Sequence, residues 1–321
     1  MSNFFVTGGS GFIGSNLVRK LLSEGHYVKV YDDFSRGKIR KINFTEKKFK
    51  FVNGDIRDEK KVIKESKGFD YFIHLAAING TKFFYEKPQD VLDVSIRGIL
   101  TAVEACKKNT IKQIIFASSS EVYQTPPMIP TKENVPLIIP DVFNPRYSYG
   151  AGKIISEMVL LNYHRDFFKK IIIFRPHNVY GPDMGWEHVI PEMILRSEKI
   201  KNNDETFLIK GNGKQTRSFI FINDFTEILY KVVIKGKHRN IYHIGNNDEI
   251  RIKTLAKKII KYQKKNVKII CSEEPYGETP RRCPNIEKIQ GLGYEQKYSI
   301  DEGLKITSDW YLKNKNYKEE K

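Results

Sequence analysis

A tyrosine and a lysine four residues apart, Tyr149 and Lys153, have the types and spacing of a proton-transfer pair. On a helix this spacing places both side chains on one face. Because a neighbouring ammonium group favours the phenolate, we expect the pKa of Tyr149 to fall, so that its hydroxyl serves as a general base. Ser119, which follows a predicted strand, would hydrogen-bond the same substrate hydroxyl or carbonyl. A Tyr-x-x-x-Lys spacing alone is common by chance, so this prediction depends on the neighbouring motifs.

Three glycines spaced three residues apart, Gly8, Gly11 and Gly14, lie between an apolar stretch, residues 4–6, and a helical pattern. Because glycine has no side chain, such a turn lets a pyrophosphate approach backbone N–H groups at a helix N-terminus. The position between strand and helix predicts a dinucleotide-binding loop. The alternative is a glycine turn in an α/β protein that binds no nucleotide.

A second predicted strand, residues 27–31, ends at Asp32. An acidic side chain about 20 residues after the glycines accepts a hydrogen bond from a ribose 2′-hydroxyl and repels a 2′-phosphate. We therefore expect NAD(H) rather than NADP(H). Asp55 follows the third strand, where it could accept from the adenine amino group, and small residues end the fourth strand. The predicted cofactor-binding residues are Gly8, Gly11, Phe12, Ile13, Gly14, Asp32, Asp55, Ile56, Leu75, Ala76, Ala77, Tyr149 and Lys153.

An alternation of strands and helices must position these residues. Strands are predicted at residues 4–6, 27–31, 49–52, 71–74, 113–117 and 171–174, with helices notably at 88–108 and 148–168. Apolar strands that alternate with helices indicate a parallel sheet covered on both faces. The predicted fold class is therefore α/β, with a Rossmann-type doubly wound parallel sheet. In the second half we expect a helix from about Val189 and a strand pair at 207–209 and 219–222.

Composition excludes several classes of protein. The net charge of +17 invites a nucleic-acid interpretation, but the lysines are spread along the 321 residues and no nucleic-acid-binding motif occurs. No apolar run approaches the ~20 residues of a membrane helix, and no signal peptide precedes the first strand. Three widely spaced cysteines are typical of free thiols in a reducing cytoplasm, and no metal site is expected.

In several motifs the chain resembles the extended short-chain dehydrogenase/reductase family. Residues 7–14 (TGGSGFIG) are similar to its opening motif, residues 118–123 (SSSEVY) to its serine strand, and Tyr149 with Lys153 to its catalytic pair. More narrowly, residues 175–182 (RPHNVYGP), 211–219 and 281–284 resemble nucleotide-sugar epimerases, dehydratases and decarboxylases. Residues 1–176 with about 213–247 would then form an NAD-binding domain. Residues 177–212 and 248–321 would form a smaller α/β domain that binds the nucleotide sugar.

The resemblance implies a nucleotide-diphosphate sugar as substrate, NAD as cofactor and a homodimer. Arg217 and Arg282 would hold the diphosphate, because two cations suit a pyrophosphate dianion; the alternative for either arginine is a surface ion pair. Pro176 would lie near the nicotinamide. The substrate-binding residues implied are Asn178, His188, Val189, Arg217 and Arg282. A rival from another class is a cofactor-binding regulatory protein on the same fold, although such proteins often lose the tyrosine–lysine pair.

Glu121 distinguishes the possible reactions. Residues 119–121 resemble a segment of the decarboxylases of UDP-glucuronate, and Ser120 replaces the aspartate usual in 4,6-dehydratases. In an extended strand Ser119 and Glu121 would share one face, so Glu121 would lean towards the sugar beyond C4. We expect Tyr149 and NAD+ to oxidise C4, and Glu121 to assist dehydration or decarboxylation. A 4-epimerase and an oxidoreductase that releases a keto product are the alternatives, with Glu121 then hydrogen-bonded to backbone.

Overall fold

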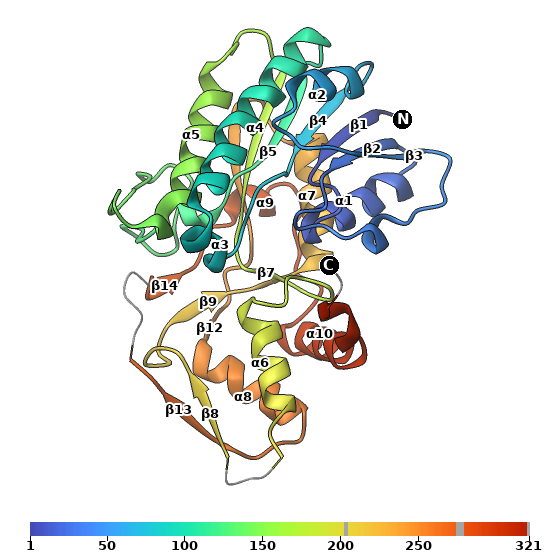
Figure 1. Ribbon diagram of the computed structural model, residues 1–321. Helices are drawn as coiled ribbons and strands as arrows, with labels where there is room; N and C mark the ends of the chain where they lie inside the picture. The colour runs from blue at the N-terminus through green and yellow to red at the C-terminus, as the bar shows by residue number, and fades with distance from the viewer. Residues whose placement is uncertain (202–204, 274–278, 320–321) are drawn as a thin grey trace.

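The protein, seen as a computed structural model that describes residues 1–201, 205–273 and 279–319, is built around a seven-stranded sheet (Figure 1). The strand order is β11-β6-β5-β4-β1-β2-β3, and every neighbouring pair is parallel. The predicted doubly wound parallel sheet is therefore confirmed. The strands are β1 (Asn3–Thr7), β2 (Tyr27–Asp32), β3 (Phe49–Asn53), β4 (Tyr71–His74), β5 (Gln113–Ala117), β6 (Lys170–Pro176) and β11 (Asn240–Ile244).

Both faces of the sheet are covered by helices. Phe4 and Val6 of β1 pack in one cluster with side chains of α1 (Phe12–Ser23) and α7 (Ile222–Lys235). Phe5 points the opposite way, because successive side chains of a strand alternate. It packs on the face covered by three helices, α2 (Glu59–Glu65), α4 (Pro88–Lys108) and α5 (Ser148–Asn162). Burial on two sides is why these strands are continuously apolar.

Residues suited to helix N-termini, a proline and side chains that cap the first turn, are found where several helices begin. Pro88 lies in the first turn of α4, where the missing N–H has no intrahelical partner to lose. The Asp58 carboxylate accepts a hydrogen bond from the Lys61 backbone N–H and caps α2. A capping box between Ser299 and Glu302 begins α10 (Ile300–Lys313). These caps hold the ends of the helices that surround the sheet.

A second group of elements lies beyond the carboxyl ends of the strands (Figure 1). It contains small sheets and three helices of ten or more residues within the described ranges. The strands are β7 (Val179–Tyr180), β8 (Thr206–Ile209), β9 (Thr216–Ser218), β10 (Ile220–Phe221), β12 (Glu249–Arg251), β13 (Lys268–Cys271) and β14 (Arg281–Arg282), and the helices are α6 (Val189–Glu198), α8 (Ile252–Tyr262) and α10. The predicted domain boundaries stay a prediction.

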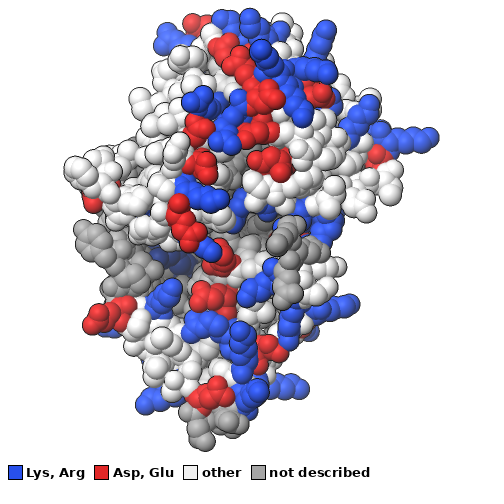
Figure 2. All heavy atoms as spheres, in the orientation of Figure 1, with Lys and Arg blue, Asp and Glu red and all other residues white. Residues whose placement is uncertain are grey.

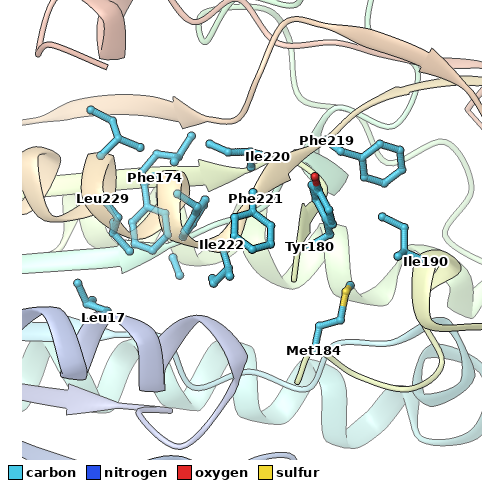
Figure 3. Packing of buried hydrophobic residues seen from close by; sticks show 14 of the residues in the cluster. Leu17, Phe174, Tyr180, Met184, Ile190, Phe219, Ile220, Phe221, Ile222 and Leu229 are labelled. Atoms are coloured by element: carbon cyan, nitrogen blue, oxygen red, sulfur yellow. The ribbon is translucent and has the colours of Figure 1, made fainter. Parts of the chain in front are cut away.

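Apolar packing joins this second group to the sheet. Figure 3 shows Tyr180, Met184 and Ile190 beside Phe221 and Ile222, which lead into α7. All five side chains are less than a tenth exposed. Since α7 also covers the sheet, one continuous cluster runs from the sheet into the second group. This continuity attaches the second group of elements to the sheet.

Two predictions about the elements are wrong. The segments 207–209 and 219–222 do not pair, because β8 pairs with β13 and β10 pairs with β7. The helix expected at 148–168 ends at Asn162, since Tyr163 is extended and His164 has a φ of 47°, which an α-helix cannot accommodate. The helix expected from about Val189 is confirmed as α6. Among the described residues, no helix combines the length and the apolar character that crossing a membrane requires.

Candidate active site

The glycine loop joins β1 to α1, as predicted, and its three glycines have different reasons to lack a side chain. Gly8 has a φ of +72°, and a Cβ there would lie 2.6 Å from the Ala76 backbone nitrogen. A Cβ on Gly14 would lie 2.7 Å from the Gly9 Cα. At Gly11 the nearest protein atom to such a Cβ is the Gly8 carbonyl oxygen at 3.3 Å. The fold therefore requires Gly8 and Gly14, whereas Gly11 leaves space that a ligand could use.

A cleft that is partly open to solvent lies beside this loop, at the carboxyl ends of the strands. Several predicted cofactor residues meet in its lining, from four different strand ends: Gly8, Gly11, Asp32, Asp55, Ile56, Leu75, Ala76 and Ala77. Six other predicted residues are not in that lining: Phe12, Ile13 and Gly14 lie at the start of α1, Pro176 at the end of β6, and Tyr149 and Lys153 on α5.

The residues of the cleft fit a dinucleotide. Helix α1 begins after Gly11 with no side chain capping it and no acidic residue in its first turn. Its first N–H groups and the positive end of its dipole are therefore available to an anionic diphosphate. The Asp32 carboxylate accepts hydrogen bonds of 2.9 Å from the Ser10 and Phe34 backbone N–H groups, and burial raises its pKa. These bonds fix Asp32 in the lining of the cleft, where it could accept a hydrogen bond from a ribose hydroxyl.

Asp55 has a partner that the sequence did not reveal. The Arg57 guanidinium donates to the Asp55 carboxylate at 2.6 Å and holds the pKa of that carboxyl below its usual range. Arg57 also donates to Asp93 at 3.0 Å, which ties the loop after β3 to α4. Asp55 keeps its place in the cleft lining, so its predicted contact with the cofactor stays a prediction.

Tyr149 and Lys153 lie on one face of α5, as predicted, but their electrostatics differ from the expectation. Tyr149 is buried and its pKa is raised by burial, while a hydrogen bond with the Ser119 side chain acts the other way. Burial also lowers the pKa of Lys153 to about 7. The Lys153 Nζ donates to the Ala117 carbonyl oxygen at 2.7 Å and lies 5.6 Å from the centre of the Tyr149 ring. For the protein alone, burial of Tyr149 therefore raises its pKa, where the neighbouring ammonium group was expected to lower it.

A phenylalanine that the sequence interpretation missed covers Tyr149. Phe84 belongs to a short helix, α3 (Thr81–Glu86), in a segment with no assigned pattern. Its ring stacks on the Tyr149 ring with centroids 5.2 Å apart and planes 14° apart. The Arg146 guanidinium lies 5.5 Å from the centre of the Phe84 ring. The aromatic run FFY at 83–85 was the sequence signal for this contact.

Glu121 does not lie in an extended strand, so the predicted shared face with Ser119 is wrong. Residues Ser120–Val122 form a turn of 3₁₀ helix, capped by Ser119, whose hydroxyl accepts from the Glu121 backbone N–H at 3.1 Å. The carboxylate of Glu121 pairs with Arg282 at 2.5 Å and with Arg146 at 3.2 Å. Burial disfavours its ionisation, but Arg282 and then Arg146 outweigh that effect and lower the pKa of Glu121 to about 2.

The residues implied for the substrate lie on the second group of elements. In parallel strands β9 and β14, Arg217 and Arg282 are register partners, so pairing brings together two arginines that are far apart in sequence. The Asn178 side chain donates to the Ser218 carbonyl oxygen at 2.9 Å, which ties the end of β6 to β9. His188 precedes α6, of which Val189 is the first residue, and burial lowers the pKa of His188. Their roles toward a substrate stay predictions.

Next to Ser119 and Lys153 lies a network of buried polar side chains that the sequence patterns did not indicate. The Arg175 guanidinium donates to both carboxylate oxygens of Glu157, at 2.8 and 2.5 Å, and to the Tyr123 hydroxyl. The Ser118 hydroxyl donates to Glu157. Glu157 lies one turn after Lys153 on α5, and its charge partly offsets the fall in the pKa of Lys153. The network therefore fixes the strand ends that carry Ser119 and the helix that carries the tyrosine–lysine pair.

Comparison with known proteins identifies the family to which the chain belongs. Residues 4–245 match the profile of the NAD dependent epimerase/dehydratase family. The chain is 30% identical to the UDP-N-acetyl-alpha-D-glucosaminuronate decarboxylase of Bacillus cytotoxicus, with 97% of this chain and 98% of that protein covered.

Solved structures agree with the family match. The DesIV dTDP-glucose 4,6-dehydratase of Streptomyces venezuelae, with NAD bound, has a TM-score of 0.87 at 26% identity and covers 99% of both chains. The UDP-glucose 4-epimerase of Thermotoga maritima, with UDP-glucose, has a TM-score of 0.84 at 27% identity and covers 97% of this chain and 99% of its own. The chain therefore belongs to the NAD-dependent epimerase/dehydratase family, in the nucleotide-sugar group of the extended short-chain dehydrogenases/reductases, whose cofactor is NAD.

Proposed function

We propose that this enzyme oxidises C4 of a nucleotide-diphosphate uronate and then removes the C6 carboxylate as CO2. The observation that carries the proposal is the Glu121 carboxylate held between Arg146 and Arg282 beside the catalytic pair. Two guanidinium groups and one carboxylate leave a net positive charge there. Such a charge suits a substrate that is itself negative at its C5–C6 end.

The first step uses Tyr149, Ser119 and Lys153. NAD+, when bound, accepts the hydride that leaves C4. Ser119 is hydrogen-bonded to Tyr149, so the two hydroxyls can pass on the proton that the C4 hydroxyl loses. Lys153 is fixed by the Ala117 carbonyl next to the Tyr149 ring. In that position the Lys153 ammonium group stabilises the phenolate that Tyr149 forms when its hydroxyl gives up a proton.

The second step distinguishes decarboxylation from dehydration. A 4-keto group stabilises the electron pair that stays on the sugar when the C5–C6 bond breaks, and CO2 leaves without needing a proton. C5 then takes up a proton from solvent, and C4 is reduced again. Dehydration would need an acid to protonate the leaving hydroxyl. Glu121, with a pKa of about 2, is ionised and is a poor donor, and Ser120 offers no carboxyl group.

The relatives support the same preference without deciding it. A protein 30% identical over nearly the full chain is named as a decarboxylase of a UDP-uronate. Others are named as dehydratases and epimerases. The 4-epimerase is the second candidate, because the same first step serves it and Glu121 would then only be structural.

A panel of nucleotide sugars tests the proposal. Purified protein with NAD is incubated separately with UDP-glucuronate, UDP-N-acetylglucosaminuronate, dTDP-glucose and UDP-glucose, and products are identified by mass spectrometry and by proton NMR, which distinguishes C4 epimers. Loss of CO2 from a uronate is expected. Loss of water from dTDP-glucose, or a change of C4 configuration with no change of mass, would refute decarboxylation in favour of the other two reactions.

The expected homodimer and cytoplasmic location belong to the same proposal. Ile155 and Met158 on α5 are 38% and 62% exposed, which gives this helix an outward apolar face that a second copy would cover. All three cysteines are free, as suits a reducing compartment. On the face in Figure 2, basic and acidic side chains are interspersed, which favours solvation over nucleic-acid binding. Sedimentation analysis would test the dimer.

A further inference from the structure

The short helix α3 lies between the cofactor cleft and the catalytic tyrosine and has an aromatic ring next to each. It begins three residues after Ile78, which lines the cleft. The Arg36 guanidinium, also in that lining, lies 4.4 Å from the centre of the Phe83 ring. The next residue, Phe84, stacks on Tyr149 instead. Because successive residues of a helix point about 100° apart, the two rings face in different directions.

The stack of Phe84 on Tyr149 is buried. The two side chains are 2% and 6% exposed, and they form a small apolar cluster with Val91 of α4. Their rings are nearly parallel, with centroids 5.2 Å apart. Such an offset stack is a preferred arrangement of two aromatic rings, so it favours one orientation of the Tyr149 ring.

Phe84 is held by a cation from the 3₁₀ turn Pro145–Tyr147, which leads directly into α5. The Arg146 guanidinium lies 5.5 Å from the centre of the Phe84 ring, within the range of a cation–π contact. Arg146 is itself paired with the Glu121 carboxylate at 3.2 Å. Helix α3 is therefore attached at both of its buried or half-buried rings, to the cofactor cleft on one side and to the start of α5 on the other.

Tyr149 depends on such packing because its hydroxyl has one specific partner, the Ser119 side chain. A tyrosine hydroxyl lies at the end of a side chain with two rotatable bonds. A small change in either torsion would therefore move it away from Ser119 and from a substrate hydroxyl. A displacement of ~1 Å is enough to slow a reaction by about 100-fold.

We propose that Phe84 is a positioning residue for proton transfer: its ring fixes the Tyr149 ring, so that the hydroxyl stays against Ser119, and it keeps water away from that hydroxyl. This inference rests on the first step of the proposed function, the oxidation of C4, which decarboxylation and 4-epimerisation share. Water would solvate the phenolate and lower the pKa of Tyr149, whereas burial raises it. A poorly solvated phenolate takes up a proton more readily, which favours its action as a base.

The charged groups near Tyr149 do not change when Phe84 is replaced. They lie on three elements: Lys153 on α5, Glu121 after β5 and Arg146 before α5. On α3, Lys82 and Glu86 lie 4.0 Å from each other and are more than half exposed. Helix α4 contributes the apolar Val91 to the cluster. A shift in the titration of Tyr149 in a Phe84 variant therefore reports the entry of water.

The first experiment compares three substitutions on α3. Phe84→Ala removes the ring and its cover, whereas Phe84→Leu keeps an apolar cover that cannot stack. Tyr85→Ala is the matched control, because it removes a neighbouring aromatic ring that is 51% exposed. NADH formation is followed by absorbance in a single turnover, over a range of pH, with the nucleotide sugar that the wild type converts.

The three variants should differ in rate and in pH profile. For Phe84→Ala we expect the maximal rate to fall by about 10- to 100-fold, because the hydroxyl is misplaced. The midpoint of its pH profile should move down by about 0.5–1 pH unit, because water reaches the phenolate. Phe84→Leu should lose about 2- to 10-fold in rate, with the midpoint of the wild type, because only the stack is missing. Tyr85→Ala should match the wild type in both.

A titration of the protein without ligands tests the exclusion of water without any turnover. Tyrosine isotope-labelled at Cζ gives an NMR signal that moves when the hydroxyl ionises, and loss of one signal in Tyr149→Phe identifies that residue. In the wild type, Tyr149 should stay un-ionised at about pH 10, where an ordinary tyrosine is half ionised. In Phe84→Ala its signal should move at a lower pH than in the wild type.

A role limited to packing predicts a different pattern. Phe84→Ala would then lower the amount of active protein equally at every pH, and its midpoint and its NMR titration would coincide with those of the wild type. Either coincidence overturns the inference, as does a wild-type rate in Phe84→Leu. Binding of NAD within about threefold of the wild type shows that a variant is folded, and if Phe84→Ala fails this test, the rate of Phe84→Leu decides. Failure of the wild type to convert any nucleotide sugar would instead refute the proposed function, and the NMR titration would still decide the role of Phe84.

Discussion

Replacing Gly11 by alanine should separate cofactor binding from folding. Gly11 has a φ of −72° and a ψ of 179°, which alanine adopts without strain. The new Cβ would lie 3.3 Å from the Gly8 carbonyl oxygen, a contact relieved by a shift of a few tenths of an ångström. We expect a cost below about 1 kcal/mol for that contact. A gain of about 0.4–1 kcal/mol from the lower entropy of the unfolded chain offsets it.

The same methyl group should strongly weaken NAD binding. It points into the space where a diphosphate approaches the first N–H groups of α1. Losing one charge-assisted hydrogen bond costs about 1.5–3 kcal/mol. Since about 1.4 kcal/mol corresponds to tenfold in affinity, we expect the Kd for NAD to rise by roughly 10- to 150-fold. Calorimetry with NAD gives the Kd, and thermal unfolding without NAD gives the stability.

Two further glycine variants make this result specific. Gly14→Ala places a Cβ 2.7 Å from the Gly9 Cα, which is backbone and cannot give way, so the fold itself should be destabilised by more than about 1 kcal/mol. Gly68→Ala has a φ of +81° and no atom within 4 Å, so it should cost about 1–2 kcal/mol of stability with NAD binding unchanged. The reasoning is refuted if Gly11→Ala binds NAD within about threefold of the wild type.

Further predictions concern the charges and hydroxyls around the cleft. Tyr149→Phe should keep the stack on Phe84 yet slow NADH formation by about 10²–10⁴-fold in a single turnover, and a nearly normal rate would exclude Tyr149 as the base. The pKa of Lys153 falls from 10.5 to about 7 on folding, so the unfolded chain binds more protons between those pH values. The free energy of unfolding of the wild type, relative to that of Lys153→Met, should therefore rise with pH across that window by up to about 1.4 kcal/mol per pH unit. Urea titrations that show the same pH dependence for both proteins would contradict this prediction. Asp32→Ala should weaken NAD binding and reduce the ratio of the affinity for NAD to the affinity for NADP, both measured by calorimetry. An unchanged ratio would show that the 2′-hydroxyl of the adenosine ribose does not contact Asp32. Arg217→Ala should weaken UDP binding by about 10- to 150-fold and leave NAD binding unchanged, whereas equal loss of both ligands would indicate a folding defect.

The main sheet and the cofactor loop could be predicted from the sequence alone. Apolar runs between helical patterns are a local property, and burial on both faces of a parallel sheet leaves little else that they could form. The glycine loop could also be predicted, because the steric demands at Gly8 and Gly14 arise within one strand–turn–helix unit. Strand pairing outside the main sheet could not be predicted in this way. The segment 207–209 is extended as predicted, yet its partner β13 lies some sixty residues further along the chain.

The electrostatics of the site depend on contacts that form only in the folded chain. The spacing of Tyr149 and Lys153 predicted a shared helix face, but it could not show that both side chains are desolvated, which reverses the expected shift in the pKa of Tyr149. Nor could it show that Arg146 and Arg282 meet on Glu121, because the pairs are 25 and 161 residues apart. Identities and spacings along a chain specify which groups are present and which helix face they share. Burial and partners at long range, which set the charge that each group carries, exist only once the chain has folded.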